Sequence, residues 1–168
     1  PTSEKPIIAA GEAMVLADIL EVIFIESPQV MYFTLIAVFF TVLILLGNLK
    51  NTILALLPAT ITMVITIGLV ALTPVHFDYL NIVMIPVLFG LGVDGGIHIM
   101  TRFAENQDAG LTMQQTSRAI TGALVTSALG FGAMMLTSHP ALRSLAALSL
   151  VGLAANLLSC LVGLPSLL

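Results

Sequence analysis

The stretch Phe89-Gly90-Leu91-Gly92-Val93-Asp94-Gly95-Gly96-Ile97-His98-Ile99-Met100 places one carboxylate, one imidazole and four glycines inside an apolar run. Apolar runs that are long enough to span a bilayer rarely carry an ionisable residue unless that residue has a function. The stretch therefore decides two questions together: whether the chain spans a membrane, and whether Asp94 carries its chemistry.

The composition of the chain is that of a polytopic membrane protein. Of its 168 residues, 58% are hydrophobic and 8% are charged, whereas a soluble domain has about 25% charged residues. The mean hydropathy is +1.12. The formal net charge is −4 and the five basic residues are scattered, so the clustered Lys and Arg of a nucleic-acid-binding surface are absent from the sequence. We therefore expect no nucleic-acid partner.

Five apolar runs predict five transmembrane helices. About 20 residues are needed to cross a hydrocarbon core of about 30 Å, and runs without period-two alternation favour helices over a barrel. The predicted spans are residues 30–46, 52–72, 80–100, 119–137 and 144–164. The predicted fold class is an all-α membrane protein with a five-helix transmembrane bundle.

The segments outside these runs predict a lead-in helix and one long connection. Residues 10–26 have acidic residues between apolar ones, which is typical of an amphipathic helix at the membrane surface. Ser27-Pro28 predicts a break between this lead-in helix and the first span. The longest predicted connection is residues 101–118, with Thr112 as the candidate N-cap of a short helix that leads into the fourth span.

Basic residues in the short connections predict the orientation of the bundle. Lys50 lies in the first connection, Arg102 and Arg118 lie in the third, and Arg143 lies in the fourth. Short cytoplasmic loops carry an excess of Lys and Arg. We therefore expect the first and third connections to be cytoplasmic and the lead-in helix to be on the outer side.

Asp94 and His98 are four residues apart, so on a helix they share a face. A charge at membrane depth costs about 2.5–3.5 kcal/mol on insertion scales, and a carboxyl group there favours its neutral, protonated form. A carboxyl that exchanges a proton can couple proton entry to a conformational change. We therefore predict a proton relay at Asp94 and His98. The alternatives are that Asp94 only breaks the helix or forms a hydrogen bond between helices, with no transport role, and that His98 only reaches the headgroups or a carbonyl.

The residues around the predicted relay suggest close helix packing. Gly92 and Gly96 form a GxxxG pair, which lets another helix approach closely. We predict that Gly90, Gly92, Gly95 and Gly96 serve helix packing and flexibility rather than ligand contact. Thr126 and Ser127 in the fourth span and Asn156 in the fifth are possible hydrogen-bond partners, and ordinary polar contacts between helices are the favoured explanation of each.

Other chemistries have little support in the sequence. Cys160 is the single cysteine, and a lone cysteine makes neither a disulfide framework nor a zinc site. His76, Asp78 and His139 lie in the connections without diagnostic metal spacing, so we predict no metal site and no cofactor other than protons as the coupling ion. No nucleophile or nucleotide-binding motif is present, and we expect no enzyme activity.

The glycine-rich stretch, followed by Arg102-Phe103, resembles the Asp-bearing helix of the resistance-nodulation-division (RND) superfamily. The similarity is greatest to the branch of MMPL-type and hopanoid-exporter-like lipid transporters, and it extends over Leu136–Arg143 and Leu150–Leu168. Many MMPL-type members have Tyr after this Asp, whereas Gly95 follows Asp94 here. An aromatic hydroxyl partner for the carboxyl group is therefore missing at this position.

The resemblance implies a transporter of which this chain is one part. Residues 1–28 would be the end of an outer domain and the interfacial lead-in, and residues 29–168 would be the C-terminal half of an RND-type transmembrane domain. The implied function is export of lipids or other hydrophobic molecules from the bacterial inner membrane, driven by the proton-motive force. The implied partners are the missing N-terminal half, membrane lipids and a hydrophobic substrate, and a homo-oligomer is compatible with this family. The alternative is a sterol-sensing-like or structural membrane module without proton-coupled transport.

Overall fold

The computed structural model describes residues 12–72 and 79–168, which form five α-helices and contain no strand. The predicted all-α, five-helix bundle is therefore confirmed. The helices are α1 (Glu12–Leu46), α2 (Leu49–Leu72), α3 (Tyr79–Asn106), α4 (Ala109–Met134) and α5 (Pro140–Leu158). The chain continues from α5 into a π-helical turn, Ser159–Gly163, and a 3-10 turn, Pro165–Leu167.

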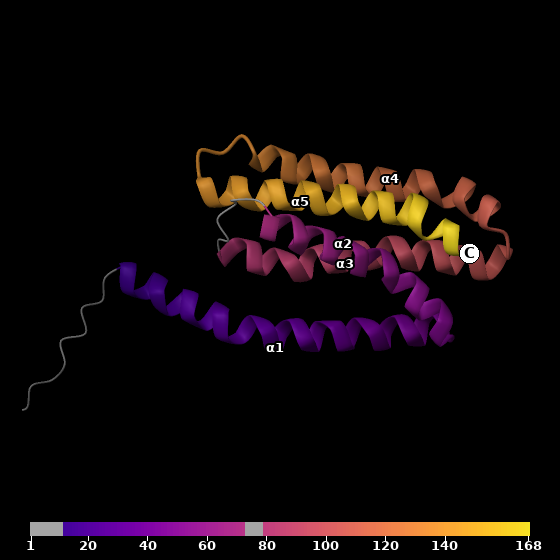
Figure 1. The fold of residues 1–168 in the computed structure, drawn as a ribbon, viewed down its shortest axis with the longest axis horizontal. Coiled ribbons are helices and arrows are strands. Elements are labelled where there is room, and N and C mark those ends of the chain that lie inside the picture. Colours follow the sequence, from indigo (N-terminus) through magenta and orange to yellow (C-terminus); the bar gives the residue numbers. More distant parts are fainter. Residues whose placement is uncertain (1–11, 73–78) are drawn as a thin grey trace, which may run out of the picture.

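The centre of the bundle is α3, which contacts each of the other four helices. In Figure 1, α2 and α3 lie between α4 and α5 on one side and α1 on the other. The inner side chains of α3 are fully enclosed, with Ile99 and Met100 both at 0% exposure. The Asp94 stretch therefore lies in a helix that packs against all four of the other described helices.

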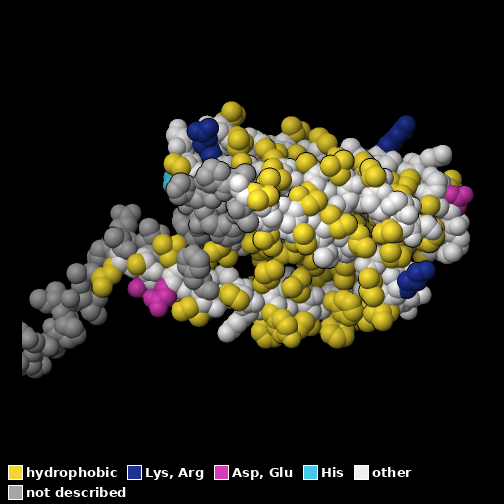
Figure 2. All heavy atoms as spheres, viewed as in Figure 1, with side chains coloured by type: hydrophobic (Ala, Val, Ile, Leu, Met, Phe, Trp, Pro, Cys, Tyr) yellow, Lys and Arg dark blue, Asp and Glu magenta, His cyan; other side chains and the backbone are white. Residues whose placement is uncertain are grey.

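The first helix packs more loosely than the rest. Only 6% of the most apolar window of α1 is buried, compared with 44% for α3 and 50% for α5. An apolar groove of about 560 Å³ separates the middle of α1 from the start of α3, and Figure 2 shows a hollow along this boundary. The N-terminal part of α1 also extends past the ends of the other helices (Figure 1).

The predicted break at Ser27-Pro28 is wrong, because α1 is a single helix of 35 residues that includes Pro28. A proline removes one backbone hydrogen bond, but membrane helices tolerate it where nearby groups satisfy the freed carbonyl. The helix bends along its length in Figure 1 rather than ending. The lead-in segment is therefore continuous with the first span, while residues 1–11 of the predicted unit 1–28 lie outside the described residues.

The predicted connection at residues 101–118 is also wrong. The third helix continues to Asn106, the fourth begins at Ala109, and only two residues join them. The N-cap of α4 is Asp108, whose carboxylate accepts a hydrogen bond from the Leu111 amide. Thr112, the predicted cap, is buried inside the helix and donates to the Asp108 carbonyl at 2.7 Å. Polar residues lie on the exposed sides of both helices here, so polarity did not indicate where the helices end.

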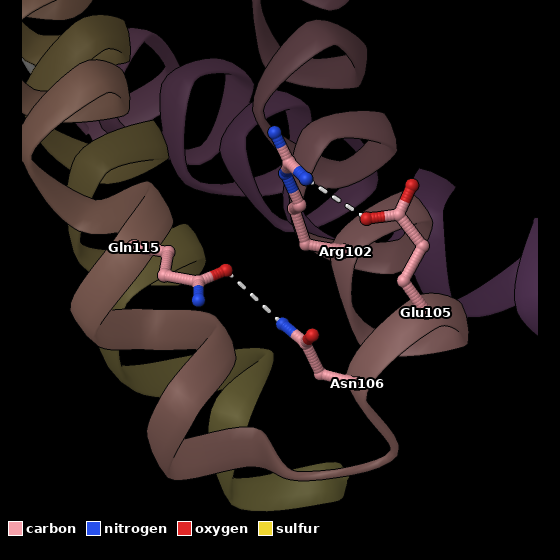
Figure 3. Close-up of polar contacts among 4 residues, drawn as sticks. All are labelled: Arg102, Glu105, Asn106 and Gln115. Atoms are coloured by element: carbon pink, nitrogen blue, oxygen red, sulfur yellow. Dashed lines mark hydrogen bonds and ion pairs between the residues drawn. The ribbon is translucent and has the colours of Figure 1, made fainter.

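A small polar network marks this end of the bundle (Figure 3). Arg102 forms an exposed ion pair with Glu105 at 2.9 Å, and the Asn106 amide donates to Gln115 at 3.2 Å across the α3–α4 junction. Exposed pairs of this kind contribute little to stability, roughly 0–1 kcal/mol. Both contacts lie at the end of the bundle where α3 joins α4.

Four of the described helices are long and apolar enough to cross a membrane: Ala17–Leu46, Leu49–Leu69, Asn81–Asn106 and Pro140–Leu167. Figure 2 shows the matching surface, with hydrophobic side chains over most of the visible face and charged side chains towards the two ends. The fourth helix, α4, is not among the four. A span at residues 119–137 therefore stays a prediction, as does the orientation of the bundle.

Candidate functional site

Asp94 lies at the middle of the apolar stretch Asn81–Asn106 of α3. The helix continues through four glycines around it, although glycine costs about 1 kcal/mol relative to alanine inside a helix. Helix contacts, rather than local propensity, explain why the helix persists. The contacts on each side of α3 therefore define the geometry of the site.

One side of α3 is in close contact with α2 through Gly92 and Gly96. A Cβ atom on Gly92 would lie 2.8 Å from the Ala59 Cα, and a Cβ atom on Gly96 would overlap the Ala55 carbonyl group. Both contacts involve backbone atoms, which cannot rotate away as a side chain can. The GxxxG pair therefore lets the backbones of α2 and α3 meet directly.

Gly95 faces α4 and the π-helical turn that follows α5. A Cβ atom on Gly95 would lie 2.7 Å from Cys160 Sγ and 3.8 Å from Ile120 Cγ2. Cys160 is fully buried at the start of the π-helical turn that follows α5. The residue after Asp94 is therefore enclosed by α4 and the π-helical turn, and the space that a larger side chain would need is occupied.

Asp94 and His98 are exposed on the opposite side of α3. Both line a groove between α3 and α4, which we call the α3–α4 groove, with a volume of about 200 Å³. Ser127 of α4 lines the same groove, and the remaining lining residues are apolar. No ion pair joins Asp94 to His98 in the described part of the chain. The groove therefore brings together a carboxyl, an imidazole and a hydroxyl group without fixing them in one network.

Asp94 also lines a second groove, between residues 37–42 of α1 and residues 90–97 of α3. We call it the α1–α3 groove; it is distinct from the larger apolar groove near the start of α3. The volume of the α1–α3 groove is about 260 Å³. Thr41 of α1 is the other polar side chain in its lining, and Gly90 forms part of its wall one turn before Asp94. A Cβ atom on Gly90 would meet nothing within 4 Å. Gly90 therefore borders open space, whereas Gly92 and Gly96 contact the backbone of α2.

The other candidate polar partners lie away from the carboxyl group. Thr126 is exposed and donates to the Gly122 carbonyl of its own helix at 2.9 Å. Asn156 is 1% exposed, and its amide donates to the Leu91 carbonyl at 3.2 Å. Asn156 also accepts a weak hydrogen bond from the Cys160 thiol at 3.5 Å. Of the three candidates, only Ser127 shares a groove with Asp94, whereas Asn156 joins α5 to α3 from the packed side.

The sequence did not lead us to predict that Thr41 lies in a groove with Asp94. A threonine inside an apolar run is common in membrane helices and carries no positional signal of its own. Its place became evident only when the packing of α1 against α3 was known. The predicted non-metal role of His76 and Asp78 concerns residues outside the described part of the chain, and among the described residues no three His, Cys, Asp or Glu side chains cluster as metal ligands would.

Comparison with known proteins identifies the family. The family model described as the MMPL family matches residues 1–168. The hopanoid transporter HpnN of Rhodopseudomonas palustris is 26% identical over 165 residues, which are 97% of this chain and 18% of the relative. A protein of Methanocaldococcus jannaschii that is named only as a membrane protein is 26% identical over 141 residues, 79% of this chain and 36% of the relative. The hopanoid transporter HpnN of Burkholderia multivorans is 23% identical over 124 residues, 74% of this chain and 14% of the relative.

The chain thus spans well under half of the length of each of these relatives. No solved structure matches it. The match of the family model extends over every residue, including the glycine-rich helix and the helices that pack around it. The chain belongs to the MMPL family.

Proposed function

We propose that this chain is the C-terminal transmembrane part of a transporter that exports lipids or other hydrophobic molecules from the bacterial inner membrane. Two of its relatives are named as hopanoid transporters, and each is several times longer than this chain. The full transporter would contain a second half with its own helices and outer domain. Protons moving down their gradient would drive the transport.

The observation that carries the proposal is the exposure of Asp94 at membrane depth, between two grooves and opposite the packed side of α3. An ionised carboxylate at this depth costs about 2.5–3.5 kcal/mol, whereas the neutral carboxyl costs far less. A purely structural acid would be expected to be enclosed by hydrogen-bond donors. Asp94 instead borders open space on both sides, as a group that gains and loses protons requires.

The proton gradient can supply the energy for a conformational change at this site. Moving one charge across 100 mV yields about 2.3 kcal/mol, enough to shift a two-state equilibrium by more than tenfold. Loading Asp94 removes its charge and so allows the open side of α3 to pack against an apolar neighbour. Releasing the proton restores the charge and reverses this preference. His98, one turn away and in the same groove, is the proposed group that passes the proton to and from Asp94.

The test is lipid transport by the full-length protein in vesicles with an imposed pH gradient. Asp94→Asn keeps the size and polarity of the side chain but cannot exchange a proton, so we expect gradient-driven transport to be lost. Glu105→Gln is the matched control, because Glu105 is an exposed acid on the same helix that pairs only with Arg102 at the end of the bundle. It should transport as the unmodified protein does.

The result also separates transport from the alternative of a sterol-sensing-like or structural module. Transport that is independent of the pH gradient, or that persists in Asp94→Asn, would contradict proton coupling through this residue. Membrane insertion of Asp94→Asn at the normal level, measured by fractionation, ensures that a loss of transport reflects chemistry rather than folding.

A further inference from the structure

The α1–α3 groove brings two polar side chains together inside an otherwise apolar surface. Asp94 and Thr41 both line it, and both are exposed in the described structure. The other lining residues, such as Val38, Val93 and Ile97, offer no polar side-chain atom. A carboxyl group that turns towards α1 therefore has one side-chain partner available there, and that partner is the Thr41 hydroxyl.

The hydrogen bond that Thr41 already makes determines which form of Asp94 it can bind. Its hydroxyl donates to the Ala37 carbonyl at 2.8 Å. A hydroxyl group has one proton to donate and two lone pairs that accept, so the Thr41 oxygen remains available as an acceptor. A protonated carboxyl has an O–H donor, whereas an ionised carboxylate has none. Thr41 in this conformation therefore matches the proton-loaded form of Asp94 and not the ionised form.

We propose that Thr41 accepts a hydrogen bond from the protonated carboxyl of Asp94 across the α1–α3 groove, and that this bond couples proton loading to the position of α1. The inference rests on the proposed proton coupling of Asp94 and assigns it a positioning residue on a second helix. In the ionised state the Asp94 carboxylate has no proton to give, and the bond to α1 is released.

The loose packing of α1 allows this hydrogen bond to affect the position of the helix. Little of α1 is buried against the rest of the bundle, so fewer buried side chains oppose a movement of α1 than oppose a movement of α3 or α5. The groove also has the room that a moving carboxyl group needs, because Gly90 contributes no side chain to it. A helix that is already tightly packed, such as α2, could not respond in this way.

The groups around Asp94 leave Thr41 as the partner on this side. In the α3–α4 groove the titratable neighbour is His98, and α4 contributes only the Ser127 hydroxyl. In the α1–α3 groove no titratable side chain faces Asp94. On the packed side, α2 presents Ala55 and Ala59, and the π-helical turn presents the Cys160 thiol to Gly95. We therefore assign the pH response of the α1 contact to Asp94, and His98 is the ionisable group that shares the other groove with it.

The experiment compares three threonine variants in the full-length transporter reconstituted into vesicles. Thr41→Val removes the hydroxyl at nearly constant volume, and Thr41→Ser retains it. Thr60→Val is the matched control, because Thr60 is an exposed threonine of α2 whose hydroxyl makes the same local bond, to the Leu56 carbonyl at 2.9 Å. Gradient-driven transport is measured as a function of pH, and infrared difference spectra record the band of the protonated carboxyl that Asp94→Asn removes.

We expect Thr41→Val to move the pH of half-maximal transport in the acidic direction by about one pH unit, the shift that corresponds to one ordinary hydrogen bond. The direction follows because the lost bond stabilises the protonated form, so a higher proton concentration is needed to load Asp94. The infrared band should move to the frequency of a carboxyl without that acceptor. Thr41→Ser and Thr60→Val should retain the original pH profile and band.

Three other outcomes would contradict either the inference about Thr41 or the proposed function. If Asp94→Asn abolishes transport but Thr41→Val keeps the original pH profile and band, the inference about Thr41 is wrong and the proposed function stands. If Thr41→Val and Thr41→Ser lose transport equally without a pH shift, Thr41 acts through packing and the inference is also wrong. If Asp94→Asn transports normally, the proposed function itself fails.

Discussion

On one side of α3, Gly92 and Gly96 touch the backbone of α2, and Gly95 lies against Cys160. On the other side, Asp94 and His98 are exposed, and Gly90 borders open space. The two sides are built from one short stretch, and their residues alternate along the sequence. On the packed side, glycines admit the backbone of α2 and the Cys160 side chain, whereas the open side presents the ionisable groups of Asp94 and His98.

The glycines of this stretch therefore have different structural roles at neighbouring positions: some contact another backbone and one borders a groove. A glycine that contacts a backbone cannot be replaced without moving a helix, whereas a glycine at a groove can be replaced at little cost to packing. Substitutions that add one methyl group to each side therefore test the comparison directly. The largest effect is expected where the backbone contact is closest.

Gly96→Ala should cause the greatest loss of stability. The added Cβ atom would overlap the Ala55 carbonyl group, and because neither atom belongs to a flexible side chain, α2 and α3 must separate. Overpacking of this kind costs about 3 kcal/mol or more. Unfolding of the purified protein in mixed micelles measures the effect, and a cost below about 1 kcal/mol would show that α2 and α3 are not in backbone contact at Gly96.

The main features of this helix pair were predictable from the sequence. The GxxxG spacing of Gly92 and Gly96 indicates a close helix contact by itself, and apolar length indicates the bundle. What the sequence could not indicate is which helix makes the contact, since Ala119 and Ala123 of the fourth span have the same spacing as Ala55 and Ala59 of the second. The partner α2 is determined by the packing of all five helices together.

The polar residues around the site were less predictable, for a physical reason. Ser, Thr and Asn side chains in membrane helices bond equally well to their own backbone, to another helix or to a functional group. Thr126 bonds to its own helix, Asn156 bonds to α3 on the packed side, and Ser127 lies in a groove with Asp94. The helix ends near residues 101–118 were predicted wrongly because polar residues there lie on the exposed sides of helices that continue, and not in a loop.

Asn156→Ala should have the second-largest effect on stability. It removes a buried hydrogen bond to the Leu91 carbonyl that joins α5 to α3 one turn before Asp94. Hydrogen bonds between membrane helices contribute about 0.6–2 kcal/mol, and the loss should lie in that range. Thr126→Ala is the control, because its exposed hydroxyl bonds only within α4, and it should change stability by less than about 0.5 kcal/mol. Equal effects of the two variants would contradict the assignment of Asn156 to the packed side.

Gly95→Ala should cost less than either, because its nearest neighbour is a side chain. The added methyl group would lie 2.7 Å from Cys160 Sγ, and the sulfur can give way in part, so we expect about 1 kcal/mol. Cys160→Ala in the same protein should restore most of the lost stability, since it removes the atom in conflict. A double variant that is no more stable than Gly95→Ala alone would show that Gly95 meets something other than Cys160.

Gly90→Ala should have the smallest effect on stability, although Gly90 lies only two residues from Gly92. A Cβ atom there meets nothing within 4 Å, and replacing glycine by alanine inside a helix is favourable by about 0.5–1 kcal/mol. We therefore expect unchanged or slightly raised stability in the same unfolding measurement. A loss of about 2 kcal/mol or more would mean that another part of the transporter fills the α1–α3 groove. The open side of α3 would then be a second packed side, and Asp94 would have to exchange its proton through the α3–α4 groove alone.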